Sequence, residues 1–202
     1  KGIESTCSFR TCYVHGGLEP TGGFGTNSRL ILYEYDWKKE EWSTPTAEDS
    51  PSRYGHAFIF VDLRQSLYSW GGFEIKDETY TNFPIIQEIS ELNIQSNAWT
   101  LKSVNTDDTY APDFALGMKA VSFRGLIWAH GGSFDSYPFA TLYRLDLNVM
   151  HLSVIGTTFQ KRCFSSIFSL DNFLFFFGGG DPEIAKASQA SITTLEEAEP
   201  IG

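Results

Sequence analysis

Positive charge and cysteine are scarce in this chain of 202 residues, and long apolar stretches are absent from it. The longest strongly apolar run, Phe173 to Phe177, is far shorter than the roughly 20 residues that a membrane-spanning helix needs. No signal-peptide pattern opens the sequence. We therefore expect no membrane span. The 15 Lys and Arg side chains stand against 25 Asp and Glu, a formal net charge of -10, which opposes binding to phosphate backbones. We expect no nucleic-acid partner.

The chain has three cysteines, an odd number that is too small for a scaffold built from disulfides. Cys12 and Cys163 stand in strand-like runs, where we expect buried thiols that act as small apolar side chains. A bridge between Cys7 and Cys12 is the alternative. The sequence also has no Asn-x-Ser/Thr acceptor for glycosylation. Together these features favour a cytoplasmic location, and a secreted one stays open.

Glycine, in contrast, is arranged in a pattern: four doublets each close an apolar run. The second glycines of successive doublets are separated by 55, 60 and 47 residues. A period near 50 is typical of propeller blades. The doublets are Gly16 and Gly17, Gly71 and Gly72, Gly131 and Gly132, and Gly178 and Gly179.

The segments around each doublet recur in a fixed order. Before the second doublet stand Arg53-Tyr54-Gly55-His56 and two apolar runs separated by a charged turn; after it come a polar loop, a strand-like run, a short turn and Trp99. Trp42 stands one period earlier, 57 residues before Trp99. In the third unit His151 stands near the expected tryptophan position. We predict that Trp42 and Trp99 occupy equivalent places on the last strands of consecutive blades, packed between sheets.

This order of strand, Gly-Gly, variable loop, strand and Trp resembles kelch repeats over nearly the whole chain. The resemblance implies an all-β fold of four-stranded antiparallel meanders, the blades of a β-propeller. At about 50 residues per blade, we expect three to four blades from a fragment of a larger ring, with the missing blades supplied by the rest of the protein or another chain. The expected units are 1–50, 51–110, 111–160 and a partial 161–180. For 181–202 we expect an acidic tail, disordered or weakly helical, and the alternative is a linker or the start of the next blade.

Candidate catalytic chemistry is not supported by the residue pattern. Each histidine occupies a repeat position, so a structural role is favoured over metal ligation. Gly-x-Ser-x-Gly is absent, and the doublets are not followed by the helix that phosphate binding would require. We predict no catalytic residue, metal or cofactor. The alternative is a propeller enzyme that resembles galactose oxidase, or an extracellular carbohydrate-binding propeller.

The positions of the loops indicate a functional face. In an antiparallel meander, the loop between strands two and three emerges on the same face as the loop to the next blade. These are the long loops here, and the opposite face has tight turns. Long loops on a rigid scaffold are where binding usually resides. The long loops are 18–29, 73–88, 133–141, 43–52, 102–113 and 156–161.

The side chains of these loops indicate the kind of partner. Acidic side chains outnumber basic ones by eleven to four, and aromatic side chains, favoured anchors at interfaces, lie among them. We predict a non-catalytic protein-interaction module, a scaffold, adaptor or substrate receptor, that binds a protein segment with Lys or Arg and an apolar anchor. The expected binding residues are Phe73, Glu74, Asp77, Glu78, Tyr80, Phe83, Asp107, Asp108, Tyr110, Phe134 and Tyr137.

Overall fold

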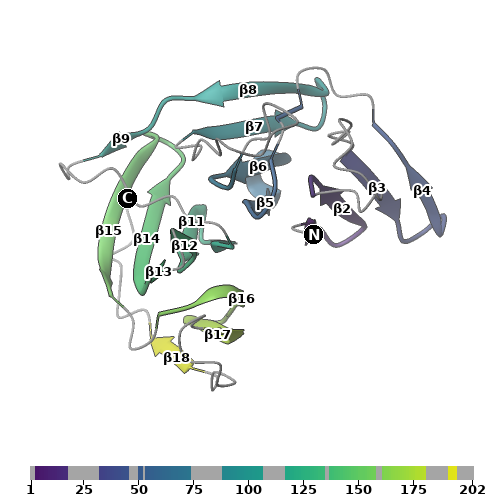
Figure 1. Cartoon of the computed structure of the whole chain (residues 1–202). Coiled ribbons are helices and arrows are strands. Elements are labelled where there is room, and N and C mark those ends of the chain that lie inside the picture. Colours follow the sequence, from purple (N-terminus) through teal and green to yellow (C-terminus); the bar gives the residue numbers. More distant parts are fainter. Residues whose placement is uncertain are drawn as a thin grey trace, which may run out of the picture.

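The computed structural model describes residues 3–17, 32–45, 50–51, 53–73, 88–106, 117–134, 137–157, 161–180 and 191–194. These residues form antiparallel sheets, as the runs of Val, Ile, Leu, Tyr, Phe and Trp bounded by turn residues predict. The sheets follow one another along an arc around a common centre (Figure 1). Within the described part of the chain, no helix is long and apolar enough to cross a membrane.

Blades 1 and 2 are four-stranded meanders in which each strand pairs with the next in sequence. Blade 1 consists of β1 (Glu4–Cys7), β2 (Thr11–His15), β3 (Leu32–Asp36) and β4 (Glu41–Ser43). Blade 2 consists of β5 (Ala57–Val61), β6 (Ser66–Trp70), β7 (Ile89–Asn93) and β8 (Ala98–Lys102), with a short 3-10 turn, η1 (Asp62–Arg64), between β5 and β6.

Blade 3 has the same four strands and a fifth that joins its outer edge. The four are β10 (Lys119–Phe123), β11 (Leu126–His130), β14 (Thr141–Asp146) and β15 (His151–Thr157). The fifth, β9 (Asn105–Thr106), follows blade 2 in sequence and pairs in parallel with β15. A two-stranded ribbon of β12 (Ser133–Phe134) and β13 (Tyr137–Pro138) lies between β11 and β14 in sequence.

Blade 4 consists of β16 (Cys163–Leu170), β17 (Phe173–Gly180) and β18 (Ser191–Thr194). Residues 191–194 were expected in an acidic tail or linker, but they form a third strand that pairs antiparallel with β17. The described strands leave the arc open between blade 4 and blade 1, as expected for part of a ring (Figure 1).

The core lies between the blades. One cluster fills the space between blades 1 and 2 and includes Tyr13, Phe58 and Trp99. The largest cluster joins blades 2 and 3 around Trp70 and Tyr143. A third joins blades 3 and 4 around Trp128 and Phe176. Each blade therefore depends on its neighbours to cover its faces, because a single sheet leaves apolar side chains exposed on both sides.

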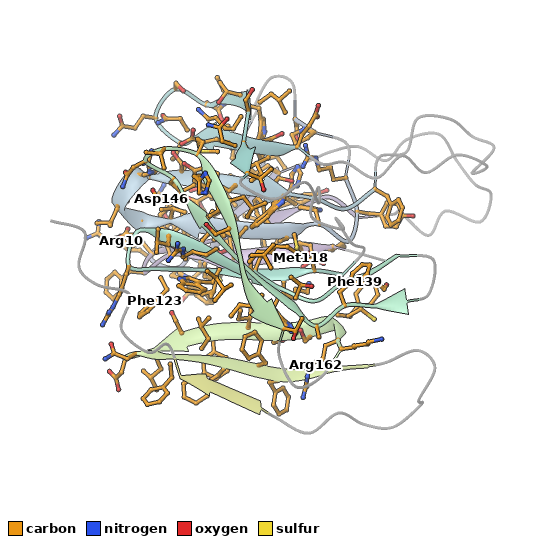
Figure 2. The ribbon with its side chains drawn as sticks, turned by 90° about the vertical axis from the view of Figure 1, so that its left-hand side faces the viewer. Arg10, Met118, Phe123, Phe139, Asp146 and Arg162 are labelled. Carbon is orange, nitrogen blue, oxygen red and sulfur yellow. A yellow bond between two sulfur atoms is a disulfide. The ribbon has the colours of Figure 1, made fainter. Side chains whose placement is uncertain are left out.

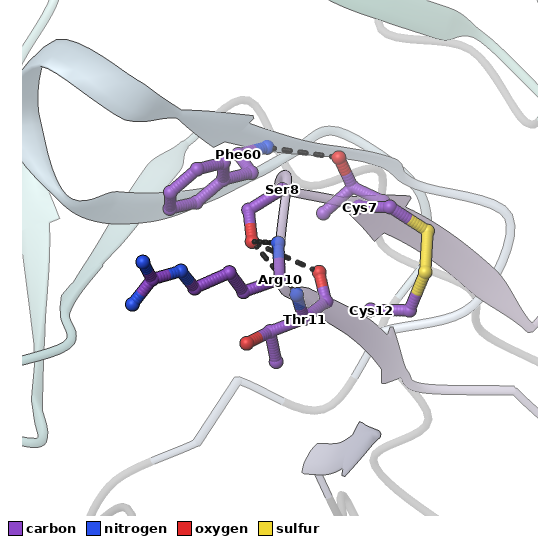
Figure 3. Close-up of a disulfide and its surroundings, with 7 residues drawn as sticks. Cys7, Ser8, Arg10, Thr11, Cys12 and Phe60 are labelled. Atoms are coloured by element: carbon purple, nitrogen blue, oxygen red, sulfur yellow. Dashed lines mark hydrogen bonds between the residues drawn. A yellow bond between two sulfur atoms is a disulfide. The ribbon is translucent and has the colours of Figure 1, made fainter. Parts of the chain in front are cut away.

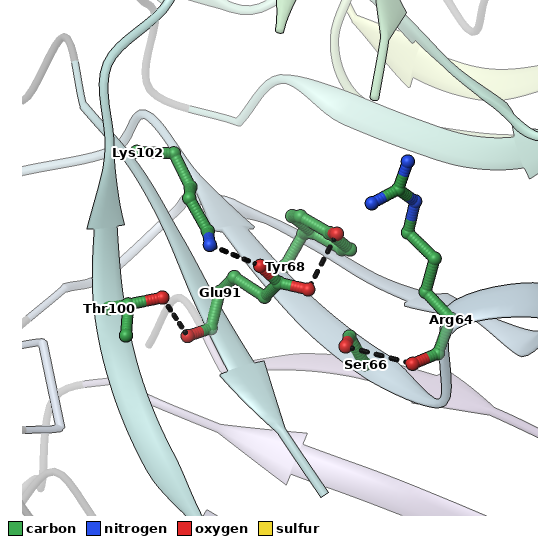
Figure 4. A network of polar contacts seen from close by, with 6 residues as sticks. All are labelled: Arg64, Ser66, Tyr68, Glu91, Thr100 and Lys102. Atoms are coloured by element: carbon green, nitrogen blue, oxygen red, sulfur yellow. Dashed lines mark hydrogen bonds and ion pairs between the residues drawn. The ribbon is translucent and has the colours of Figure 1, made fainter. Parts of the chain in front are cut away.

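Blade 2 also carries a polar network within its sheet. The Glu91 carboxylate accepts a hydrogen bond from the Tyr68 hydroxyl at 2.8 Å and forms an ion pair with the Lys102 ammonium at 2.6 Å (Figure 4). Burial, followed by the hydrogen bond to Glu91, raises the pKa of Tyr68. The Glu91 carboxylate is thus compensated by two donors, which offsets the cost of taking it out of water.

The predicted tryptophan positions are equivalent, but only one is buried. Trp42 pairs with Tyr35 and Trp99 with Leu92, at the same register of the third and fourth strands. Trp99 is 9 % exposed and Trp42 is 61 % exposed. The prediction of a buried Trp42 is wrong because Trp99 packs against blade 1, whereas no described strand covers the corresponding side of blade 1.

In blade 3 the tryptophan position belongs to Leu152, not to His151. Leu152 pairs with Leu145 just as Trp99 pairs with Leu92, and it is buried in the core between blades 2 and 3. A one-residue shift along a strand moves a side chain to the other face of the sheet. His151 is therefore in the place that Ala98 takes in blade 2.

Candidate functional site

The strand pairings define two faces of the arc. His15, Trp70 and His130 end the second strands of blades 1 to 3, and the doublet glycines follow them. The long connections leave from this edge, which we name the loop face. The short turns between first and second strands and between third and fourth strands lie at the opposite edge, which we name the tight-turn face. Figure 2 shows Phe139 and Arg162 towards the loop face and Arg10, Phe123 and Asp146 at the tight-turn face.

All eight doublet glycines have positive φ values, from 66° to 98°. At Gly16 and Gly131, a β-carbon would overlap the backbone carbonyl oxygen of Arg53 and Arg162, respectively. The doublets thus let the next blade come close, as the sequence predicted. Gly17 and Gly132 donate their N–H groups to those same two carbonyls, at 3.3 and 2.7 Å. The first and third doublets therefore each join two blades at the loop face.

Two buried arginines stand beneath this face. Arg53 is 4 % exposed, and its guanidinium donates to the carbonyls of Ser69 and Glu88 at 3.1 and 2.8 Å and to the Ser90 hydroxyl at 3.0 Å. It thereby joins the strands on either side of the 71–88 connection. In the sequence, Arg53 stands out only as part of the Arg53-Tyr54-Gly55-His56 opening, which does not indicate this role.

Arg162 is the counterpart of Arg53 in blade 4. It is 1 % exposed and donates to the Gly178 carbonyl at 2.6 Å. The common signal in the sequence is an arginine two residues before a residue that takes a left-handed φ, as in Arg53-Tyr54-Gly55 and Arg162-Cys163-Phe164. These arginines link the backbone at the base of the loop face.

The inner strands are linked around the centre by a chain of backbone hydrogen bonds. The Gly117 N–H donates to the Gly55 carbonyl at 2.8 Å, and the Phe164 N–H donates to the Gly117 carbonyl at 2.9 Å. All three residues have left-handed φ values, 62°, 76° and 53°. A Lys119–Glu4 ion pair also joins the inner strands of blades 1 and 3. Gly117 therefore keeps the place of Gly55 although the Arg-x-Gly-His opening is absent from blade 3.

The histidines near this face are buried and neutral. His15 Nδ1 lies 3.0 Å from His56 Nε2, and His15 Nε2 lies 3.1 Å from the Ser50 hydroxyl. Burial lowers the pKa of His15 to about 3 and that of His56 well below its ordinary value; the neighbouring Arg53 charge acts in the same direction. Burial lowers the pKa of His130 to about 4, and its ring packs on Phe176 with centroids 4.6 Å apart.

These geometries correspond to structural histidines. Among the described residues, no three His, Cys, Asp or Glu side chains are placed to hold one metal ion. His15 and His130 occupy equivalent strand ends in blades 1 and 3, and His15 contacts a second histidine, His56. The pairing with His56 joins residues 41 apart in sequence, which no local pattern could reveal.

The cysteines differ from the favoured prediction. Cys7 and Cys12 are directly paired across β1 and β2 and form a disulfide (Figure 3). Cys163 is a buried thiol, as expected, and its Sγ donates to the Gly180 carbonyl at 3.3 Å. The expectation of a thiol at Cys12 is wrong because the register of the hairpin places it opposite Cys7, a relation that cysteine spacing alone left open.

The predicted binding residues are described only in part. Phe73 lies at the loop face, where its backbone bridges to Tyr54 and the two rings stack with centroids 5.7 Å apart. The backbones of Phe134 and Tyr137 pair across the β12–β13 ribbon, so these two residues are neighbours. The other eight lie outside the described residues: Glu74, Asp77, Glu78, Tyr80, Phe83, Asp107, Asp108 and Tyr110.

The fold and the loop face together define a β-propeller of the kelch type. A solved structure titled "Structure of YjhT" shares this fold, with a TM-score of 0.68 and 16 % sequence identity over 90 % of this chain and 58 % of that one. The sequence model of the KLHDC2/KLHL20/DRC7 Kelch-repeats domain matches residues 2–194. The chain therefore belongs to this kelch-repeat family, as its glycine doublets and tryptophans indicated.

A curated relative is Tip elongation aberrant protein 3 of Schizosaccharomyces pombe. It is 27 % identical over 176 residues, which cover 74 % of this chain and 15 % of that protein. The chain thus spans a small part of this relative and a little over half of the solved propeller.

Proposed function

We propose that this chain is a non-catalytic protein-interaction module that binds its partner through the loop face. Kelch domains act in general as interaction modules, and this chain belongs to that family. The observation that carries the proposal is the base of the loop face. There the glycine doublets, Arg53 and Arg162 hold neighbouring blades and strands together, and the long connections start and end on that base. A rigid base with long loops is the usual form of a binding surface.

The chemistry of the loops supports a cationic partner segment. Their acidic excess favours Lys or Arg in the partner, and their aromatic side chains favour an apolar anchor. Tyr54 and Phe73 supply one stacked aromatic pair at the described edge of this surface. We infer that such a module serves as a scaffold, adaptor or substrate receptor.

The cytoplasmic location stays a prediction with less support than the sequence gave it. It rested partly on the expectation of reduced thiols, and the Cys7–Cys12 bridge removes that part. Disulfides persist mainly in oxidising compartments. Mass spectrometry of the native protein after thiol blocking would show whether the bridge exists in cells.

The binding proposal is tested with a fluorescent peptide of lysines around one central leucine. Charge reversal at Asp107 and Asp108 should weaken binding and lower its salt dependence, chiefly through the association rate, because rim charges steer encounter. Alanine at Tyr80 or Tyr110 should instead speed dissociation. The control variants Arg64→Ala and Asp171→Ala, on the tight-turn face, should leave the affinity nearly unchanged. The proposal fails if these controls abolish binding while the loop variants have no effect.

A further inference from the structure

The tight-turn face carries a feature that the loop-face proposal does not use. In each of the first three blades, the turn between the first and second strands contains one arginine: Arg10, Arg64 and Arg124. Arg10 and Phe123, the neighbour of Arg124, lie at the same end of the sheets in Figure 2. The corresponding turn of blade 4 has Asp171 and Asn172 instead. The arginines therefore gather on the part of the face formed by blades 1 to 3.

Two large apolar side chains, each directly before one of these arginines in sequence, are highly exposed to solvent. Phe9 is 95 % exposed and Leu63 is 83 % exposed, the highest values among the large apolar side chains of the described residues. Neither side chain supports a core cluster. Leu63 also lies next to the blade 3 turn, because a β-carbon at Gly125 would be 3.8 Å from its methyl group. Aromatic and arginine side chains are both enriched at protein interfaces.

The turn that presents Phe9 and Arg10 is held in one conformation. The Ser8 hydroxyl accepts hydrogen bonds from the N–H groups of Arg10 and Thr11, at 3.2 and 3.0 Å. The Ser8 N–H donates to the Thr11 carbonyl at 2.7 Å, and the Cys7–Cys12 disulfide closes the turn (Figure 3). A turn that is already ordered loses little conformational entropy when it binds.

The positive charges of the three arginines are not neutralised by carboxylates in the part of the chain that is described. Arg64 donates to the Asn148 side-chain oxygen at 2.8 Å, and Arg124 donates to that of Asn172. These amides are neutral and fix the arginines in place between adjacent blades. The Arg10 side chain is exposed.

Three carboxylates of the nearby turns accept hydrogen bonds within their own turns. The Asp36 carboxylate accepts the backbone N–H groups of Lys38 and Lys39, at 2.8 and 3.1 Å, and pairs with the Lys39 ammonium at 3.6 Å. The Asp146 carboxylate accepts the Asn148 N–H at 2.8 Å, and that of Asp62 accepts the Gln65 amide at 3.0 Å. These groups cap their own turns.

We propose that the tight-turn face is a second interaction surface, and that it binds an acidic protein segment carrying an apolar side chain. The guanidinium groups of Arg10, Arg64 and Arg124 receive the carboxylates, since Arg suits bidentate recognition of this group. Phe9 and Leu63 pack against the apolar side chain. The exposed apolar side chains of Phe9 and Leu63 favour a protein segment over a nucleic acid at this surface, and three arginines are few for binding a phosphate backbone. This proposal does not depend on the loop-face proposal.

The test measures the affinity of a fluorescent peptide of glutamates and aspartates around one central phenylalanine, under non-reducing conditions. Phe9→Ser and Arg10→Glu should each weaken binding about thirtyfold, the loss typical of a hot-spot residue. The matched control is Lys38→Glu, which makes the same change of charge in an exposed turn of the same face and should weaken binding less than about twofold. Thermal unfolding of the variants should match that of the parent chain, since these side chains are exposed.

Two further measurements distinguish the mechanism. Replacing both Cys7 and Cys12 by serine should weaken binding if the closed turn is pre-ordered, and unchanged affinity would contradict that role. A single-stranded oligonucleotide is the competing ligand. The proposal is overturned if the acidic peptide does not bind the parent chain, if Lys38→Glu weakens binding as much as Arg10→Glu, or if the oligonucleotide binds more tightly with the same dependence on the arginines.

Discussion

Trp99 packs against the imidazole ring of His15, with ring centroids 5.3 Å apart, and so places an outer-strand side chain of blade 2 over the second strand of blade 1. The same position in blade 1 belongs to Trp42, which contacts Tyr35 of its own sheet and is 61 % exposed. The contribution of this repeated tryptophan to stability thus depends on whether a preceding blade covers its ring.

The first prediction follows from this pair. Trp99→Ala should lower the free energy of unfolding by about 3 to 5 kcal/mol, the usual cost of removing a buried tryptophan. Trp42→Ala should change it by no more than about 0.5 kcal/mol, as is usual for an exposed site. Urea unfolding measures both. Equal losses in the two variants would mean that the side of blade 1 carrying Trp42 is covered in solution.

The second prediction concerns pH. The pKa of His15 is lowered from 6.5 to about 3 in the folded chain, so the unfolded chain binds more protons below pH 6.5. Stability is therefore fully present above that value and is lost as the pH falls. His15 alone should remove on the order of 2 kcal/mol between about pH 7 and pH 5, and His56 acts in the same direction.

Urea midpoints measured across this range check the prediction. His15→Gln should make the pH dependence shallower, even if it also lowers stability at neutral pH by disturbing the contact with His56. A flat profile between neutral pH and pH 5 for the parent chain would show that the histidines are not buried as neutral groups.

The third prediction compares two glycines. Gly131→Ala should strongly destabilise the chain, because the new methyl group would overlap the Arg162 carbonyl oxygen and the residue has a φ of 71°. At Gly178, with a φ of 66°, no atom lies within 4 Å of the new methyl group, so only backbone strain of about 1 to 3 kcal/mol is expected. Thermal unfolding of both variants measures the difference. Similar losses would mean that the close approach of Arg162 contributes nothing.

The fourth prediction concerns the open side of blade 4. Phe177 takes the place that the fully buried Trp70 has in blade 2, but it is 64 % exposed, and Phe168 on the same side is 48 % exposed. We expect the isolated chain to associate or aggregate through such faces and through its unpaired strand edges. Phe168→Lys with Phe177→Lys should reduce this association. Light scattering that shows a stable monomer of 22.7 kDa for the parent chain would contradict the expectation.

Much of the fold followed from the sequence because its signals are local. A glycine doublet after an apolar run indicates positive φ values at that place. The 57-residue spacing of Trp42 and Trp99 indicates that they occupy equivalent positions in two meanders. The kelch family and the all-β architecture depend only on such repeats. The existence of a loop face also follows, since strand reversal places the long connections on one edge.

Relations between blades came only from the tertiary structure. The sequence determined that Trp42 and Trp99 are equivalent, and the neighbouring blade decided which of them is buried. Likewise, the contact of His15 with His56, the bonds of Arg53 to strands β6 and β7, and the choice of Leu152 over His151 depend on the register and packing of distant strands. The physical reason is that the pattern of one strand specifies its own conformation, whereas burial and pairing are set by whatever surface meets it.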